Sequence, residues 1–395
     1  MSACLLHALT LQEAIDATLA HHHRIKIFYQ KLQSARAHKE LVQSADYPKF
    51  TLQASHAFDQ TLLSPKQETL HATSDEVSLE LRQKLFDFGQ TSKQLQAAEI
   101  ESKIARLSLQ ETKALVALEV KRLYKLLVLE QKAIAVRRKD LQTKRRYLAQ
   151  AKALLRQGLK TPADVSRMRA ATIAAHDAVQ KERAAYAKAK KTLELFMGEH
   201  LPAKLVLQED IFTHPVKLPQ DFSHNFTLQK TKLAIQKQKS LYQATKRQKF
   251  GHLELQASLA RIYRLATYNS NDVFLSYSLP LFDKQLRAQI QKSKIATLQA
   301  IAEHQDAKLT IQNRIASLRI DIDRLLATIA AKKAQIEAAK ETLAIMQARY
   351  KEGLSNYIEL LDSDDLLLRS RLALLQTLYT RSLLIDELRY LEGKL

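Results

Sequence analysis

The residues that can do chemistry are few in this sequence, and they are poorly placed for catalysis. His21, His22 and His23 are consecutive, so their side chains diverge around a helix instead of converging on a metal ion. Cys4 is the only cysteine, which excludes a disulfide framework and a cysteine-based zinc site. The six glycines are widely scattered, whereas P-loops and dinucleotide-binding motifs need clustered glycines. We therefore expect no enzymatic activity, no cofactor and no metal site.

The composition favours long helices and a basic surface. The chain has 395 residues with 62 Lys+Arg against 41 Asp+Glu, a formal net charge of +21. No run of about 18 apolar residues occurs, so a transmembrane helix is not expected. The basic residues are spread along helices without a nucleic-acid-binding motif. We expect no nucleic-acid partner, and the charge suits either anionic lipid head groups or a basic outer or tunnel surface.

The first eight residues, MSACLLHA, allow three interpretations. Residues 1–8 are the remnant of a leader that is cleaved after Ala8, the end of a lipobox in which Cys4 is lipidated, or a frayed terminus with an inert cysteine. The segment is too short for a complete signal peptide and lacks its basic start. The sequence leaves these alternatives open.

The rest of the chain contains the same unit twice. Three short motifs recur in the same order about 200 residues later, which is typical of an internal repeat. They are Leu52-Gln53-Ala54-Ser55 with Leu255-Gln256-Ala257-Ser258, Leu85-Phe86-Asp87 with Leu281-Phe282-Asp283, and Gly158-Leu159 with Gly353-Leu354. We assign residues 9–197 to a first structural repeat, 198–220 to a proline-containing linker and 221–395 to a second repeat.

Each repeat is predicted to contain a helix, two strands, a very long helix, a turn and a further helix. In the first repeat the opening helix is predicted over 9–46, before Pro48. Strict alternation of apolar and polar residues predicts strands over about 50–60, 75–86, 252–264 and 272–282. The proline-free segments 88–156 and 284–352 predict helices of about 100 Å each.

The second long helix carries a seven-residue apolar repeat, which is typical of a coiled coil. Its members are Ile311, Ile315, Leu318, Ile322, Leu325, Ile329, Ile336, Ala339, Leu343, Met346 and Tyr350, and Lys332 is the one polar intrusion. The fold class is therefore mainly α-helical with a small β part and an internal duplication.

Each of the four strands has one apolar and one polar face, and the apolar faces must be shielded from water. Two alternatives exist: the long helices pack on them, as in an ordinary β core, or they face lipid. Lipid permits strands only in a closed barrel, because an open edge leaves backbone groups unsatisfied. Four strands are too few to close, so the lipid alternative requires several chains to share one barrel.

After each turn between the long helices, the sequence contains a strong signal for the start of a helix. Thr161 is a predicted N-cap with a proline after it and Asp164 at the third helical position. Asn356 is a predicted N-cap with Glu359 at the third position. Each repeat is thus expected to fold back into an antiparallel helical hairpin.

Together these features resemble the TolC family of outer membrane efflux proteins. The resemblance rests on the opening Leu9-Thr10-Leu11-Gln12-Glu13-Ala14, the LFD motif before each long helix and two GL-x4-[DE]-[VL] turns, and it extends from about residue 9 to 393. It implies a homotrimer whose chains give four strands each to one 12-stranded barrel in the outer membrane of a Gram-negative bacterium. Long helical coiled coils would extend the tunnel into the periplasm.

The resemblance also implies a function. Such channels export small molecules or proteins, as in drug efflux and type I secretion, and dock with a periplasmic adaptor and an inner-membrane pump. Neither the exported substrate nor the particular pump and adaptor is identified by the sequence, and nothing in it indicates a ligand pocket. The alternative is a soluble periplasmic coiled-coil scaffold or an adaptor protein.

In this family the gate lies at the helical turns, and the gate residues can be matched to positions in this sequence. The resemblance assigns Glu359 and Asp362 to acidic rings in the pore, and Tyr350 and Asp164 to a contact that closes it. Ser355 stands where the family has a basic residue, so we expect a gate held by fewer contacts. Acids in the first turn of a helix are also favoured by the helix dipole alone. The turns themselves would meet the adaptor through Gly158, Leu159, Gly353 and Leu354.

Overall fold

The computed structural model describes residues 8–63, 69–202, 205–207, 212, 219, 221–263 and 267–393. The chain forms two compact units, each made of separate segments. The sheet unit consists of Ile27–Leu109 and Thr227–Lys308, and the helical unit of Met1–Lys26, Gln110–Phe226 and Leu309–Leu395. Each unit draws on both sequence repeats, so compactness does not follow the duplication.

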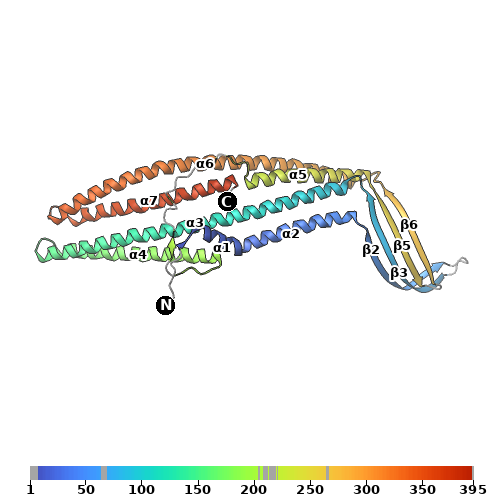
Figure 1. Ribbon diagram of the computed structural model, residues 1–395, viewed down its shortest axis with the longest axis horizontal. Coiled ribbons are helices and arrows are strands. Elements are labelled where there is room, and N and C mark those ends of the chain that lie inside the picture. Colours follow the sequence, from blue (N-terminus) through green and yellow to red (C-terminus); the bar gives the residue numbers. More distant parts are fainter. Residues whose placement is uncertain are drawn as a thin grey trace. The chain divides into compact units, whose positions relative to one another are not determined.

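The sheet unit is built on one antiparallel sheet with the order β2-β3-β5-β6 (Figure 1). Its strands are β2 (Lys49–Leu63), β3 (Thr69–Phe86), β5 (His252–Tyr263) and β6 (Thr267–Ser278). Strand β6 ends earlier than the predicted residue 282. Pro280 follows closely and has no N–H to continue the ladder.

The sheet has one apolar face that remains exposed. Pairing aligns Phe50, Leu81, Ala257 and Val273 in one row across the four strands, and Leu52, Leu79 and Leu259 in the next. Leu52 and Val273 are each 73% exposed, and Leu259 is 57% exposed. The row between them, on the opposite face, is polar: Thr51, Glu80, Ser258 and Asp272. Among the described residues of the sheet unit, therefore, no helix covers the apolar face.

The helices of the sheet unit are α2 (His23–Gln43), α5 (Phe226–Arg247) and the starts of α3 (Gln90–Arg156) and α6 (Lys284–Lys351). Ion pairs connect α3 to both of its neighbours, with Lys39 on α2 3.0 Å from Glu99 and Lys237 on α5 3.1 Å from Glu101.

The helix predicted over 9–46 is not continuous. Residues Ala8–Leu9 form a short strand, β1, that pairs in parallel with β4 (Val206–Leu207). Helix α1 (Leu11–His21) then ends because His22 adopts an extended conformation, with φ −66° and ψ 125°. Thr10 caps α1 through a reciprocal pair of hydrogen bonds with Glu13. The pairing of β1 with β4 and the reciprocal cap at Thr10 therefore set where α1 begins.

The helical unit contains two hairpins, in which α4 (Pro162–Met197) folds back along α3 and α7 (Tyr357–Glu392) along α6 (Figure 1). The predicted seven-residue repeat on α6 forms its buried face, since every member except the half-buried Met346 is buried. One apolar core surrounds Tyr124, Leu127 and Leu193, and another surrounds Met168, Leu343 and Leu360. Among the described residues, each helix falls short of the apolar run that a bilayer crossing demands.

Candidate functional site

The turns that end the two hairpins share one backbone design. Gly158 and Gly353 have φ of 76° and 80°, the left-handed region that favours glycine. After each glycine a leucine N–H donates to the carbonyl five residues earlier, Leu159 to Leu154 at 3.0 Å and Leu354 to Arg349 at 2.9 Å. This bond is that of a Schellman motif, so both long helices end in the same way.

The same turns place two leucines in solvent. Leu159 is 66% and Leu354 67% exposed. A Cβ on Gly158 or Gly353 would meet no atom within 4 Å. The four predicted docking residues therefore form two open, apolar projections, one on each hairpin.

In the first hairpin, Asp164 takes part in the N-terminal cap of its own helix, α4. The carboxylate of Asp164 accepts hydrogen bonds from the backbone N–H and the hydroxyl of Thr161, both at 2.9 Å. The backbone N–H of Asp164 in turn donates to the Thr161 hydroxyl at 3.3 Å. The backbone bond from Thr161 lowers the pKa of Asp164, because it stabilises the ionised form.

The second hairpin caps its helix differently. The side chain of Asn356 accepts from the backbone N–H groups of Ile358 and Glu359, each at 2.9 Å. Glu359 accepts from the hydroxyl of the buried Ser355 at 2.7 Å. Asp362 lies one turn further along on the exposed side of α7, and in the described part of the chain it has no ion-pair or hydrogen-bond partner. Glu359 and Asp362 thus share one accessible face.

The predicted closing residues lie at the same end of the unit but form a different contact. The hydroxyl of the fully buried Tyr350 has no hydrogen-bond partner among the described residues. Burial and, after it, the charge of Asp164 raise the pKa of Tyr350. Asp164 therefore acts on Tyr350 through space and not through a hydrogen bond.

A cation from the first hairpin joins the second one. The Lys160 ammonium donates to the backbone carbonyl of Ser355 at 3.3 Å and lies 4.9 Å from the centre of the Tyr350 ring. Lys160 therefore links the turns of the two hairpins. Sequence reasoning missed Lys160 because nothing in one turn reveals the carbonyl that faces it from the other.

Further along the hairpins, three carboxylates surround one buried ammonium. Lys144 on α3 lies 2.8 Å from Asp365 and 2.9 Å from Asp364, both on α7, and 3.9 Å from Asp140 on its own helix. The Asp365 contact is a hydrogen bond, whereas the Asp364 oxygen is close without hydrogen-bond alignment. Carboxylate oxygens of the three acids lie within 4.8 Å of one another. The Lys144 ammonium lies among them, so this is an ion cluster that ties α3 to α7.

The cluster contains three carboxylates and one ammonium, and this excess of negative charge, together with burial, shifts the pKa values of its members. Burial raises the pKa of Asp140 to about 6, and the charges of Asp364 and Asp365 add to this against the attraction of Lys144. Burial alone would lower the pKa of Lys144, but the hydrogen bond to Asp365 and the charge of Asp364 outweigh it and raise that pKa. One signal was available in the sequence, since Lys144 interrupts the apolar series Leu141, Leu148, Ala151 on α3.

A second ion pair joins the same two helices. Lys125 on α3 pairs with Asp386 on α7, and both side chains are 6% exposed. Lys125 also donates to the carbonyl of Ser382 at 3.1 Å. Burial lowers the pKa of Lys125 in spite of the attraction of Asp386. Two buried cations on α3 therefore hold α7 in register.

Known proteins share this architecture. A family model described as outer membrane efflux protein matches residues 14–199 and 219–391. Among solved structures, CusC is similar with a TM-score of 0.87 at 18% identity, over 97% of this chain and 92% of that one. VceC of Vibrio cholerae has a TM-score of 0.85 at 16% identity, over 97% and 96% of the two chains.

The outer membrane channel MtrE of Neisseria gonorrhoeae, solved in its open state, has a TM-score of 0.84 at 17% identity, over 100% of this chain and 94% of that one. A search among proteins of curated function gave no match. At these identities the structures establish the fold, and the family model covers most of the sequence.

Proposed function

The chain belongs to the outer membrane efflux protein family, and from that premise we propose that three copies assemble into one export tunnel. The family is one of transport proteins and not of enzymes, and the chain is an outer membrane efflux channel. In the proposed assembly the sheets form the part within the outer membrane, and the helices extend the tunnel into the periplasm.

The exposed apolar face of the sheet is the observation that carries this proposal. Strands β2 and β6 are the two edges of the four-stranded sheet, and among the described residues each has one side without a partner strand. An open edge is costly in lipid, because its N–H and C=O groups find no water. Twelve strands from three chains would close the ring and turn the apolar rows toward lipid. A soluble scaffold gives no reason for this face to stay uncovered.

We place the gate at the turns. Glu359 and Asp362 share an accessible face of α7, so three chains would bring six carboxylates to the pore, where they attract cations. The contact of Lys160 with Ser355 and Tyr350 would hold the two hairpins together in the closed tunnel. This contact replaces the ionic closure that Ser355 cannot provide.

The same turns are proposed to dock a periplasmic adaptor, which links the channel to an inner-membrane pump. Their support is that both turns present the same exposed leucine after a glycine in the left-handed conformation.

Purified protein in non-ionic detergent tests the assembly. We expect an oligomer mass of three chains and discrete conductance steps in a planar bilayer. Replacing both Glu359 and Asp362 with Ala should reduce cation selectivity and weaken block by multivalent cations, while Glu341→Ala, an exposed acid on α6, should not. A monomer without conductance contradicts the tunnel, and unchanged selectivity in the double variant removes these acids from the pore.

The docking role needs variants that leave the glycine backbone intact, since a bulky residue at Gly158 or Gly353 also strains the turn. The double variant Leu159→Ser, Leu354→Ser should impair export in cells yet conduct normally in bilayers. Leu195→Ser, which changes a 73% exposed leucine on α4, is the matched control. Normal export by the double variant would leave the turns without a docking function.

A further inference from the structure

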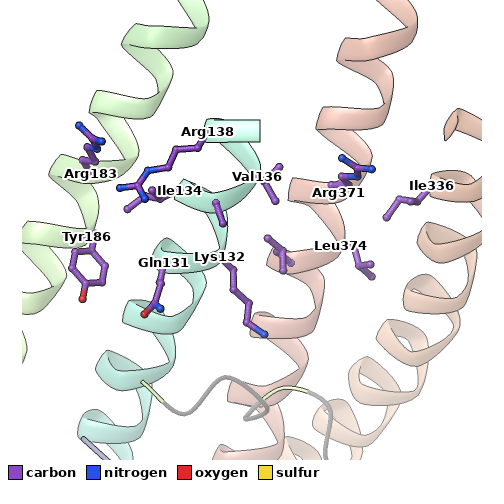
Figure 2. A pocket seen from close by; sticks show the side chains of 12 residues that line it. Gln131, Lys132, Ile134, Val136, Arg138, Arg183, Tyr186, Ile336, Arg371 and Leu374 are labelled. Atoms are coloured by element: carbon purple, nitrogen blue, oxygen red, sulfur yellow. The ribbon is translucent and has the colours of Figure 1, made fainter. Parts of the chain in front are cut away.

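A cavity of about 870 Å³ lies in the helical unit and is lined by α3, α4, α6 and α7 (Figure 2). This volume lies in the range of sites that hold small organic ligands, about 300 to 1,000 Å³. No local sequence pattern indicates this cavity, because its walls come from two hairpins that lie about 200 residues apart in the chain. It lies apart from Glu359, Asp362 and the turns, and none of these residues lines it.

The cationic side of the cavity has no acidic counterpart. Lys132, Arg138, Arg183 and Arg371 belong to its lining, which includes no Asp or Glu. In the part of the chain that the structure describes, the three arginines have no ion-pair or hydrogen-bond partner. This differs from Arg137 beside them, which pairs with Glu182 at 3.3 Å.

Two of these arginines come from different walls of the cavity. In Figure 2 the side chain of Arg138 extends from α3 toward α4, the helix that carries Arg183. Cations that line one cavity without a carboxylate repel each other, and an anion among them relieves that repulsion. A guanidinium also offers paired donors that match a carboxylate or phosphate.

The remaining lining is largely apolar. Ile134, Val136, Ile336, Leu374 and Leu375 contribute aliphatic surface from α3, α6 and α7. A small inorganic anion would leave this surface wet, whereas an aliphatic chain would remove it from water at about 25 cal/mol for each Å². The cavity therefore combines an anion-binding end with an apolar bed.

We propose that this cavity binds an amphipathic anion, a molecule with an aliphatic chain and a carboxylate or phosphate head. The head lies between Arg138 and Arg183, and the chain lies along Ile134, Val136 and Leu374. The lining contains none of the proposed gate residues, so binding to the cavity and conductance of the channel are measured separately.

The test uses the full chain in a non-ionic detergent, with binding measured by native mass spectrometry and calorimetry. The probes are laurate and dodecyl phosphate, with dodecanol, dodecyltrimethylammonium and acetate as comparisons of chain and charge. We expect both anionic amphiphiles to bind at least about tenfold more tightly than the neutral alcohol, with weaker binding at high salt. Binding of laurate alone identifies a fatty-acid type of ligand, and binding of dodecyl phosphate alone identifies a phospholipid type.

Two variants probe the two ends of the site. Arg138→Gln with Arg183→Gln should reduce anionic binding at least about tenfold, whereas Arg145→Gln, an exposed arginine elsewhere on α3, should not. Ala135→Phe fills the cavity from an exposed lining position and should block both probes. Oligomer mass and thermal midpoint confirm that each variant is folded.

Three results would overturn the proposal. Equal binding of dodecanol would show an unspecific detergent site, and equal binding of acetate would show a simple anion site. Full binding by the folded arginine double variant and by Ala135→Phe would place the ligand elsewhere.

Discussion

The two helical hairpins end in the same glycine turn but use their acidic residues in opposite ways. In α3–α4 the acid Asp164 bonds back to Thr161 and completes the cap of its own helix. In α6–α7 the cap is made by Asn356, Glu359 accepts from the Ser355 hydroxyl, and the acids beyond Glu359 are released for other contacts. Asp364 and Asp365 reach Lys144 on the other hairpin, and Asp362 remains exposed.

This difference shows how one repeated unit acquires two roles. An acid that satisfies backbone N–H groups stabilises its own helix and is not available to a pore or a neighbour. Once Asn takes over the cap, the following acids of the second hairpin are free to face a channel or to bind the first hairpin. Cations of α3 and its turn, which meet groups of α6 and α7, therefore add polar links to the apolar core that the two hairpins share.

The largest effect is expected from removing the central cation of that connection. Lys144→Met would leave Asp140 and Asp364 buried without their ammonium, and breaking such a buried pair typically costs about 3 to 5 kcal/mol. We expect a corresponding loss in the free energy of unfolding at pH 8, measured by denaturant titration. The loss should be smaller at pH 5, where the carboxylates can take up protons.

Lys152→Met, at an exposed position on the same helix, is the matched control and should change stability by less than about 0.5 kcal/mol. If both variants unfold alike, the cluster is not what joins the hairpins.

An intermediate effect is expected from the pH dependence of the same cluster. The pKa of Asp140 rises from 3.8 to about 6 on folding, so its protonated form favours the folded state. The stabilisation is complete below about pH 4 and is lost as the pH rises through 6, and it amounts to about 3 kcal/mol at 1.36 kcal/mol per pKa unit.

Asp140→Asn should remove this slope and be more stable than the unmodified protein above pH 7. The quantity to measure is the stability difference between the two proteins from pH 4 to 8, because other groups cancel in it. A stability difference that does not change with pH would mean that the Asp140 carboxyl is solvated and has an ordinary pKa.

The smallest effect is expected at the turns. Lys160→Met removes the cation that contacts the Ser355 carbonyl and the Tyr350 ring, an interaction of about 0.5 to 2 kcal/mol. In the proposed tunnel this loosens the closed turns and raises single-channel conductance or open time in a planar bilayer.

Lys160→Arg should preserve the closed behaviour, and Lys351→Met, an exposed lysine at the other turn, should leave it unchanged. Equal conductance in all three variants would separate Lys160 from gating.

Local sequence patterns predicted much of the secondary structure and of the buried helix faces. Both caps form at the predicted residues Thr161 and Asn356, and the apolar repeat of α6 is its buried face. These features depend on neighbours within a few residues, which the sequence states directly. The break at His22 was not foreseen, because the segment around it contains no proline or glycine that would end a helix. Strand β1 was not foreseen either, because its partner β4 lies far along the chain.

By itself the sequence determined that the chain is duplicated, that its strands have one apolar and one polar face, and that its turns resemble those of efflux channels. Only the tertiary structure decided that the apolar rows stay uncovered, that Lys144 meets Asp364 and Asp365, that Lys160 meets the carbonyl of Ser355, and that four helices line a cationic cavity. The reason is physical. Periodicity and caps are set by local backbone geometry, whereas a charge finds its partner only when distant helices are packed in one register.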